Sequence, residues 1–453
     1  MSVLSQNKLR FAPSPTGYLH IGNARTLILN YIFAKSLQGD LILRIDDTDK
    51  ERSEERFYDS IIDDMTWLNI DILDIKRQSE KTDQYKKIRD ILIDKGKLYP
   101  CFETDEELNK IRKLNLSRGL PPIYNRASLS LSSKEIEEFK SQGKKPYWRY
   151  RLNHEDVTWS DLIRGNQTID CSTFSDPVLI RADGSFLYTL PSVIDDIDMK
   201  ITHVLRGEDH VSNTATQIQL FDELNAEIPS FGHHSLMVHK DGSRMSKRTG
   251  SMSLRDIRDA GIEAITLVNY CARIGTSDAV EAYQDISDLI KNYDLSKISR
   301  SPARYSYEEI ELLNKKILQN KTFASVKTDL SKLGINDEIA EKFWNIIRSN
   351  INSISESQKW WDIINKDIRS DLELEDSNFF SIAYDSLPQE PWDDTTWLSW
   401  TGEVSKKTSR KGRELYLPLR LAITGENSGP ELASFLLLLG RGKVTERLEF
   451  HIK

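Results

Sequence analysis

The first 45 residues carry a strand, turn, helix and strand pattern, which limits the fold more than any other feature of the sequence. Residues 9–12 form a short apolar run that Pro13 and Pro15 interrupt. Residues 21–34 then place apolar side chains at helical spacing, and residues 40–45 are predicted to form a second strand. Such a β-α-β opening is typical of a Rossmann-type nucleotide-binding α/β fold.

The rest of the chain predicts a split α/β domain followed by a mostly helical half. Residues 98–185 break into short alternating runs, which are typical of an inserted α+β subdomain, and α/β patterning resumes at residues 186–193 and 201–206. Beyond residue 250 the periodicity is helical almost to the end, and Pro302 disfavours helix at Ser301, which marks a boundary. Helices are predicted at residues 54–68, 83–95, 213–224, 254–259, 262–273, 307–319 and 339–347.

His20 and Gly22 stand at the start of the first predicted helix, directly after the Pro/Gly turn. A lone histidine is most often a structural residue. A helix N-terminus after a strand and a tight turn, however, is a ready-made site for phosphate. We therefore expect His20 to donate a hydrogen bond to the α-phosphate of a nucleotide, and Gly22 to leave room for the adenine and ribose.

A second motif, Arg244-Met-Ser-Lys-Arg248, lies in a polar stretch flanked by Gly242 and Gly250. An exposed loop lysine is the default interpretation of any lysine. Here the glycines predict a loop that can close over ATP, with Met245 as an apolar anchor. Lys247 would then meet the β- and γ-phosphates and neutralise the leaving pyrophosphate.

Taken together and in this order, the two motifs resemble the signatures of class I aminoacyl-tRNA synthetases. The surrounding sequences Phe-Ala-Pro-Ser-Pro-Thr-Gly (residues 11–17) and Arg-Ile-Asp-Asp-Thr-Asp (residues 44–49) resemble the glutamyl-tRNA synthetases specifically. The resemblance spans nearly the whole chain. It implies ATP-dependent attachment of L-glutamate to the 3′ end of tRNA(Glu) through a glutamyl-adenylate, with Mg²⁺ accompanying the ATP.

The resemblance also implies the site residues. His20 and Lys247 would be catalytic. The ATP-binding positions would be His20, Gly22, Asn23, Leu236, Met245, Lys247 and Arg248. The glutamate-binding positions would be Arg10, Ser14, Asp46, Tyr188, Ser192 and Arg206.

Two arginines and a tyrosine suit a substrate with a side-chain carboxylate, because guanidinium groups bind carboxylates bidentately. The alternative for Arg206 is a surface salt bridge with Glu208 or Asp209. The sequence departs from the family pattern at four positions. Asn23 replaces a histidine, Asp46 a glutamate, Ser192 an asparagine and Arg244 a lysine.

The expected architecture is a split Rossmann-type catalytic domain with an α+β insertion, followed by a mostly α-helical anticodon-binding half. The catalytic domain would occupy residues 1–97 and 186–224, and the insertion at 98–185 would bind the acceptor end. Residues 225–300 would form a signature-loop and stem-contact region, and residues 301–453 an anticodon-binding domain. The resemblance implies a monomer.

Composition adds limits on metals and location. Some family members bind zinc in the insertion, but this insertion offers Cys101 without the further cysteine ligands, so no structural zinc is expected. The sequence holds three cysteines, which suits a reducing compartment. We see neither a secretory signal nor a membrane-spanning run and expect a cytoplasmic protein. A formal charge of −8 argues against non-specific binding of polyanions but not against a local RNA-binding face.

Three other functions compete with this interpretation. A glutaminyl-tRNA synthetase shares the front half but has a β-barrel anticodon region. A truncated paralogue that glutamylates a tRNA base lacks the helical half. A tRNA-binding regulatory homologue would have lost catalysis, although His20, Gly22 and Lys247 are intact here. The sequence leaves open whether tRNA(Gln) is charged in addition to tRNA(Glu).

Overall fold

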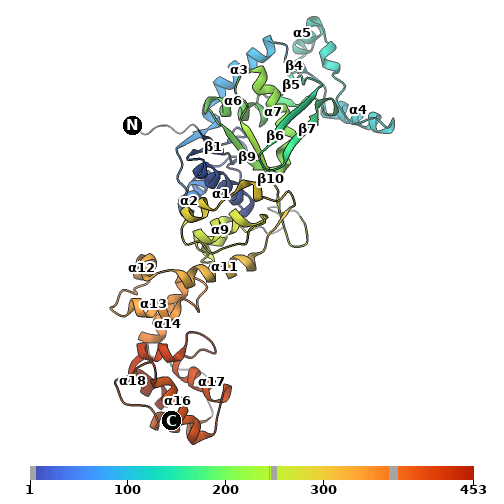
Figure 1. Cartoon of the computed structure of the whole chain (residues 1–453). Coiled ribbons are helices and arrows are strands. Elements are labelled where there is room, and N and C mark those ends of the chain that lie inside the picture. The colour runs from blue at the N-terminus through green and yellow to red at the C-terminus, as the bar shows by residue number, and fades with distance from the viewer. Residues whose placement is uncertain (1–6, 244, 246–251, 367–375, 453) are drawn as a thin grey trace, which may run out of the picture. The chain divides into compact units, whose positions relative to one another are not determined.

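The computed structural model describes residues 7–243, 245, 252–366 and 376–452 of the chain. The chain divides into two compact units. The first comprises Met1–Ile257 with Leu267–Ser306, and the second comprises Arg258–Thr266 with Tyr307–Lys453. All strands of the described residues belong to the first unit, whereas the second is helical (Figure 1). No helix among the described residues is both long and apolar enough to cross a bilayer.

The predicted β-α-β opening is confirmed. Strand β1 (Lys8–Phe11) leads through the Pro/Gly turn into helix α1 (Ile21–Ser36) and then strand β2 (Asp40–Ile45). The two strands pair in parallel, with Lys8 opposite Asp40 and Phe11 opposite Leu43. Strand β3 (Asp74–Arg77) continues the sheet on the other side of β2.

The second half of the catalytic fold returns to the side of β1. Strands β9 (His203–Gly207) and β10 (Ser230–His234) pair in parallel. Thr202, immediately before β9, donates its backbone N–H to Lys8 O at 3.0 Å, so β9 lies beside β1. The carboxyl ends of β1, β9 and β10 therefore meet at one edge, where α/β folds bind their ligands. The accompanying helices are α2 (Glu55–Trp67), α3 (Thr82–Asp94), α6 (Thr189–Asp198) and α7 (Val211–Glu223).

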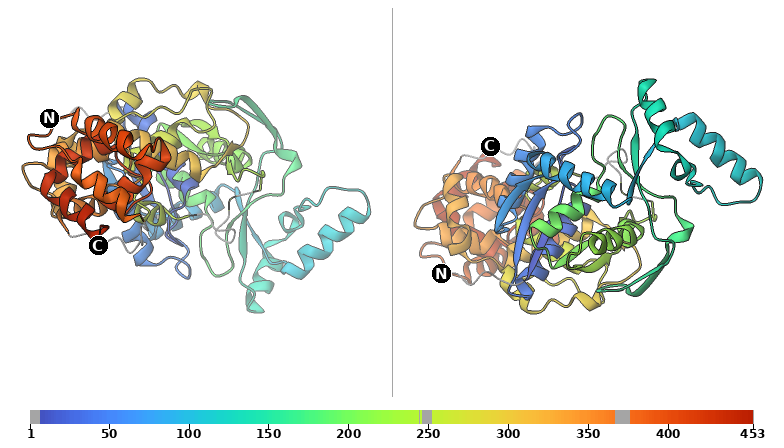
Figure 2. Two further views of the ribbon diagram at one scale, coloured as in Figure 1. Left: turned by 90° about the horizontal axis from the view of Figure 1, so that it is seen from below. Right: turned by 90° about the horizontal axis from the view of Figure 1, so that it is seen from above.

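The predicted α+β insertion is present and extends from one side of the first unit in both views of Figure 2. It holds an antiparallel sheet in the order β4-β5-β8 and a separate hairpin of β6 (Asp156–Asp161) and β7 (Gly165–Asp170). The hairpin tip docks on the catalytic fold, since Leu162 donates its backbone N–H to Phe231 O at 2.8 Å. The other elements are β4 (Leu98–Cys101), α4 (Asp105–Ser117), α5 (Ser133–Ser141), β5 (Tyr147–Tyr150) and β8 (Val178–Ile180).

The segment that follows β10 makes two close returns to the catalytic fold. Strand β11 (Met237–Val238) pairs in parallel with β12 (Ala303–Arg304), although some sixty residues separate them. Helix α8 (Leu254–Asp259) begins beside the first turn of the chain, because Leu254 donates its backbone N–H to Leu19 O at 2.9 Å. Helices α9 (Ala264–Arg273) and α10 (Ile286–Lys291) lie between these two points in sequence.

The second unit confirms the predicted helical half. Its core is built from apolar and aromatic side chains, among them the fully buried Trp344 and Trp400. The described residues of this unit contain no strand, which contradicts the β-barrel expected of a glutaminyl-tRNA synthetase. Its helices are α11 (Tyr307–Asn320), α12 (Phe323–Lys332), α13 (Ala340–Ile347), α14 (Ser357–Asn365), α15 (Ser377–Asp385), α16 (Thr396–Thr408), α17 (Arg413–Thr424) and α18 (Leu432–Phe450).

Candidate active site

A pocket of about 390 Å³ opens at the carboxyl ends of β1, β9 and β10. It brings together eight of the residues predicted from the sequence: Arg10, His20, Gly22, Asn23, Tyr188, Arg206, Leu236 and Met245. Residues as far apart in the sequence as Arg10 and Met245 thus line one cavity. Ser14, Asp46 and Ser192 are not among its described lining residues. Lys247 and Arg248 lie outside the described part of the chain.

His20 is the N-cap of α1, and this position fixes the proton on its ring. Nδ1 accepts hydrogen bonds from the backbone N–H groups of Gly22 at 3.0 Å and Asn23 at 3.4 Å. The Asn23 side chain in turn accepts from the backbone N–H of His20 at 3.2 Å, which completes a capping box. Because Nδ1 is an acceptor, the neutral ring carries its proton on Nε2. Nε2–H is the donor that the expected contact with a phosphate needs.

The ring of His20 leaves no room for a side chain at position 22. A Cβ at this position would lie 2.8 Å from His20 Cε1 and 3.0 Å from Nδ1. The ring cannot move away without losing its cap. The structure therefore adds a local reason for glycine to the expected one, which was space for the adenine and ribose.

Two described residues connect the neighbourhood of Lys247 with the pocket. Met245 lines the cavity, and Ser253 forms an isolated antiparallel bridge with His20. Met245 therefore lies at the pocket that His20 lines, and Ser253 lies beside His20 itself.

Arg206 is buried and is held by neutral groups. Its Nη1 donates to Tyr188 Oη at 3.1 Å, its Nη2 to Thr214 Oγ1 at 2.7 Å and its Nε to His233 Nε2 at 3.1 Å. A further, longer contact joins Nη2 to His210 O at 3.4 Å. Burial lowers the pKa of the guanidinium below its ordinary value.

The alternative of a surface salt bridge for Arg206 is wrong. Glu208 instead accepts from Arg164 Nη1 at 2.7 Å and from the backbone N–H of Leu236 at 3.1 Å. Asp209 lies 3.9 Å from His210 Nε2. Among the described residues, Arg206 makes no ion pair, so it is a buried cation without a carboxylate within ion-pair distance.

Tyr188 is tuned by the arginines around it. Burial alone would raise the pKa of its hydroxyl, but Arg206, Arg10 and Arg44 outweigh burial and lower the pKa. The oxygen accepts from Arg206, which leaves its own O–H to donate to a ligand oxygen. Tyr188 and Arg206 thus form a paired donor site for an acceptor group.

The predicted residues Asp46 and Ser192 take part in a buried network centred on Arg44. Asp46 accepts from Arg44 Nε at 2.7 Å and from Nη2 at 3.1 Å, and Ser192 Oγ accepts from Nη2 at 2.8 Å. Arg44 Nη1 also donates to Asp196 at 2.8 Å, and Asp196 accepts from Arg10 Nε at 3.1 Å. Burial raises the pKa of Asp46, while Arg44 acts in the opposite direction.

This network changes the expected picture of the glutamate-binding residues. Both carboxylate oxygens of Asp46 are engaged by a neighbouring guanidinium rather than turned to the pocket. The expectation that Asp46 holds the α-ammonium group directly stays a prediction, as do the contacts predicted for Ser14 and Ser192. Arg10 lines the pocket, but its Nε is engaged by Asp196.

Several lining residues were missed by the sequence analysis. Arg44 was missed too, although it is not itself a lining residue, because no motif carries it and its partner Asp196 lies 152 residues away. His234 lines the pocket and contacts Thr26 Oγ1 through Nε2 at 3.1 Å, and burial with the nearby Arg25 lowers its pKa to about 3. His210 also lines the pocket, and burial together with Arg206 lowers its pKa to about 4. Both rings are therefore neutral at pH 7.

Comparison with known proteins shows the family to which the chain belongs. Residues 6–320 match the family described as tRNA synthetases class I (E and Q), catalytic domain, and residues 364–452 match a family described as anticodon binding domain. The chain is 47% identical to "Glutamate--tRNA ligase 1" of Chelativorans sp. (strain BNC1), over 97% of this chain and 99% of that protein. It is 44% identical to "Glutamate--tRNA ligase 1" of Maricaulis maris (strain MCS10), over 97% and 98% of the two chains.

A solved structure is similar along its whole length. A glutamate tRNA ligase from Elizabethkingia meningosepticum CCUG26117, crystallised in complex with its amino acid, superposes with a TM-score of 0.85 at 25% identity and 99% coverage of both chains. The family match covers more than half of the sequence and includes every described residue of the pocket. The chain therefore belongs to the glutamate–tRNA ligases, a family of class I aminoacyl-tRNA synthetases.

Proposed function

We propose that the enzyme attaches L-glutamate to the 3′ end of tRNA(Glu) in two steps. In the first step the α-carboxylate of glutamate attacks the α-phosphate of ATP, which forms glutamyl-adenylate and releases pyrophosphate. In the second step the terminal adenosine of the tRNA takes the acyl group and AMP leaves. The observation that carries this proposal is the buried Arg206, a cation without an ion-pair partner among the described residues, in the same pocket as the His20 helix start.

The charge balance around Arg206 supports glutamate as the amino acid. Arg10 and Arg44 share the carboxylates of Asp46 and Asp196, whereas the partners of Arg206 among the described residues are all neutral. An unpaired buried charge is costly, so a ligand that brings a carboxylate is strongly favoured. Arg206 Nη1 has a second N–H, and together with Tyr188 O–H it can receive the two oxygens of the glutamate side chain.

The start of α1 supports the nucleotide side of the reaction. The first N–H groups of a helix and its positive end favour phosphate. We assign His20 Nε2–H to the α-phosphate, with Gly22, Asn23, Leu236 and Met245 around the nucleotide and Lys247 and Arg248 on its phosphates. Catalysis of this step then rests on positioning and on charge stabilisation in the transition state.

Mg²⁺ fits this site as a partner of the ATP phosphates. Asp209 is the one carboxylate among the described lining residues, and Mg²⁺ in nucleotide sites takes one or two carboxylates with phosphate oxygens and water. Asp209 would hold the ion, which would neutralise phosphate charge. We propose no structural zinc. Metal analysis of the purified protein should give well under one zinc per chain, because the insertion holds two cysteines, Cys101 and Cys171, too few for a cysteine ligand set, and about one zinc per chain would contradict this.

We assign the tRNA contacts by region. The insertion at residues 98–185 would hold the acceptor end, residues 225–300 the stem, and the helical residues 301–453 the anticodon. We further propose that the enzyme is a cytoplasmic monomer, which sedimentation analysis with and without tRNA would test. Charging of tRNA(Gln) as well as tRNA(Glu) is a second candidate activity, and supplying the two purified tRNAs side by side distinguishes the two.

Pyrophosphate exchange with glutamate is expected to be nearly absent without tRNA. In our proposal the acceptor end completes the active site, as in an induced-fit enzyme. Exchange should be measured with tRNA(Glu), with tRNA lacking its terminal adenosine, and with no tRNA. Robust exchange by the tRNA-free enzyme would contradict this requirement. No exchange under any of the three conditions would favour the regulatory homologue instead.

A further inference from the structure

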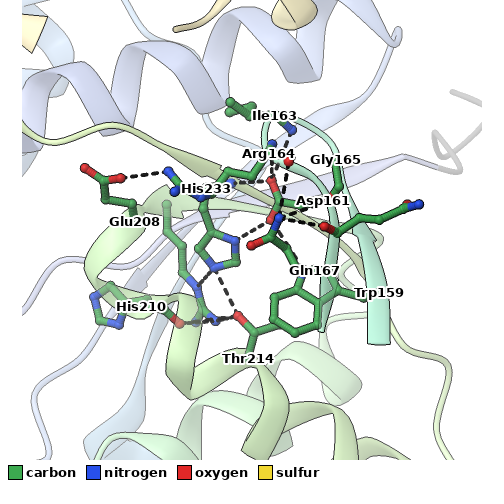
Figure 3. Close-up of polar contacts among 12 residues, drawn as sticks. Trp159, Asp161, Ile163, Arg164, Gly165, Gln167, Glu208, His210, Thr214 and His233 are labelled. Atoms are coloured by element: carbon green, nitrogen blue, oxygen red, sulfur yellow. Dashed lines mark hydrogen bonds and ion pairs between the residues drawn. The ribbon is translucent and has the colours of Figure 1, made fainter. Parts of the chain in front are cut away.

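A fully buried histidine, His233, lies behind Arg206 and links it to a carboxylate. Its Nδ1 is 2.5 Å from Asp161 Oδ2, and its Nε2 is 3.1 Å from Arg206 Nε and 3.0 Å from Thr214 Oγ1. Figure 3 shows the ring between Asp161 and Thr214. The register of β9 and β10 places Arg206 directly opposite His233, so the link is built into the parallel sheet.

Asp161 determines which ring nitrogen of His233 carries the proton. Its Oδ1 accepts from the backbone N–H groups of Ile163, Arg164 and His233 at 3.0, 3.0 and 3.1 Å. Hydrogen bonds from His233 and from backbone N–H groups overcome burial and lower the pKa of Asp161 to about 2. An ionised carboxylate only accepts, so Nδ1 must be the protonated nitrogen.

The other ring nitrogen is therefore an acceptor, which is what Arg206 requires. Burial and the charge of Arg206 keep the pKa of His233 below its ordinary value, although Asp161 acts in the opposite direction. In the neutral ring Nε2 has a lone pair, and Arg206 Nε–H donates to it. The other tautomer would set N–H against N–H at this contact.

His233 completes a set of contacts that orients the guanidinium of Arg206. His233 holds Nε, Thr214 holds Nη2, and Tyr188 accepts from Nη1. The Cζ atom of Arg206 also lies over the ring of Phe231, 5.4 Å from its centroid. With Nε and Nη2 engaged, the edge that carries Nη1 is the one directed to Tyr188 and the ligand.

Asp161 comes from the insertion rather than from the catalytic fold. It ends β6, and the turn after it is fixed to the catalytic fold by Leu162 N–H to Phe231 O and by the Arg164–Glu208 ion pair. The subdomain assigned to the tRNA acceptor end thus supplies the carboxylate that sets the proton on His233.

We propose that His233, held in one tautomer by Asp161, is a positioning residue that orients Arg206 and so contributes to selection of glutamate over glutamine. The proposal rests on the assignment of Arg206 to the glutamate side chain. Neither His233 nor Asp161 touches the substrate in this arrangement. Their effect reaches the pocket through the guanidinium alone.

The experiment compares variants by the ratio of kcat/KM for glutamate to kcat/KM for glutamine, in pyrophosphate exchange with full-length enzyme and tRNA(Glu). His233→Leu removes the acceptor and should lower the ratio by about 10- to 100-fold, chiefly through a higher KM for glutamate. The KM for ATP should stay within about twofold. His233→Gln should restore the ratio to within about threefold, because its amide can donate to Asp161 and accept from Arg206.

Asp161→Asn tests the tautomer without removing the ring. Three backbone N–H groups face Oδ1, whereas Oδ2 meets His233 Nδ1 and, at 3.4 Å, the indole N–H of Trp159, so the amide NH₂ should take the place of Oδ2 and donate to Nδ1. The proton then moves to Nε2, against Arg206 Nε–H, and the ratio should fall as in His233→Leu. Imidazole ¹⁵N shifts of histidine-labelled enzyme should report this change of tautomer. Gln167→Ala is the matched control, because Gln167 bonds to backbone carbonyls in the same hairpin turn.

Arg206→Ala, alone and combined with His233→Leu, separates the two proposals. If His233 acts through Arg206, the double variant should have the same ratio as Arg206→Ala alone. A collapsed ratio in Arg206→Ala with an unchanged ratio in both His233→Leu and Asp161→Asn would overturn the role of His233 and leave the proposed function intact. An unchanged ratio in Arg206→Ala would overturn both. If His233→Leu fails to fold, Asp161→Asn and His233→Gln decide the question.

Discussion

Replacing Arg206 with alanine is expected to lower the preference of the enzyme for glutamate over glutamine by as much as about 10⁴-fold. Glutamine is nearly isosteric with glutamate, so shape discriminates little. What differs is that the amide presents an NH₂ group where glutamate presents a second acceptor oxygen. When glutamine binds, its NH₂ group would meet the N–H of Arg206 and the O–H of Tyr188, which are donors themselves, so no hydrogen bond can form. A desolvated charged group left unpaired costs more than about 1–3 kcal/mol.

The measurement is the ratio of activation rates for the two amino acids in tRNA-dependent exchange. Arg56→Ala serves as control, since Arg56 is an exposed arginine that pairs with Glu54 away from the pocket. Its ratio should stay at the wild-type value. An unchanged ratio in Arg206→Ala with normal affinity for glutamate would remove Arg206 from the site.

Lys247→Ala is expected to reduce adenylate formation by about 2–4 kcal/mol of transition-state stabilisation, the usual scale for one preorganised charge. The prediction rests on the motif and on two described residues, Met245 within it and Ser253 after it, because Met245 lines the pocket and Ser253 bridges to His20. The loss should appear in the exchange rate, while affinity for tRNA should change little.

Exchange must be measured with tRNA present, beside filter binding of the same tRNA. Lys87→Ala is a suitable control, because Lys87 is an exposed lysine of α3 that does not line the pocket. Exchange within about threefold of the wild type, which is under roughly 1 kcal/mol, would show that Lys247 is not catalytic.

The fold was predictable wherever one short segment carries its own signal. Residues 40–45 and 254–259 have the predicted bounds, and α1 begins at the predicted residue, because apolar periodicity, prolines and the N-cap all lie within the segment. Strand β3 was missed because its residues are exposed or half-buried and show no alternation. Helix α4 has no buried residue, yet the pair Thr104 and Glu107 forms a capping box that the sequence could have revealed.

The residues of the site were likewise predictable only where a nearby sequence signal marks them. His20 and Gly22 could be predicted because a motif carries them, and Arg206 because the resemblance to the family implies it. Arg44 and His233 could not, since their roles come from partners far away in the chain, 152 residues for Arg44 with Asp196 and 72 for His233 with Asp161. Local periodicity contains no information on such pairs. Two-residue strands such as β11 and β12 escape prediction for the same reason, since neither has a pattern of its own.

The neutral hydrogen-bond partners that Arg206 has among the described residues also bear on how this catalytic unit can evolve. A buried guanidinium without a carboxylate partner weakens the folded state relative to a paired or apolar alternative. A mutation that placed an acidic residue beside it would strengthen the fold and occupy the group that we assign to the substrate. At this position a change that raises the stability of the fold would lower the selectivity for glutamate, which is the usual trade-off at functional sites. Substrate that binds to Arg206 would relieve the tension by acting as the missing counter-ion of the fold.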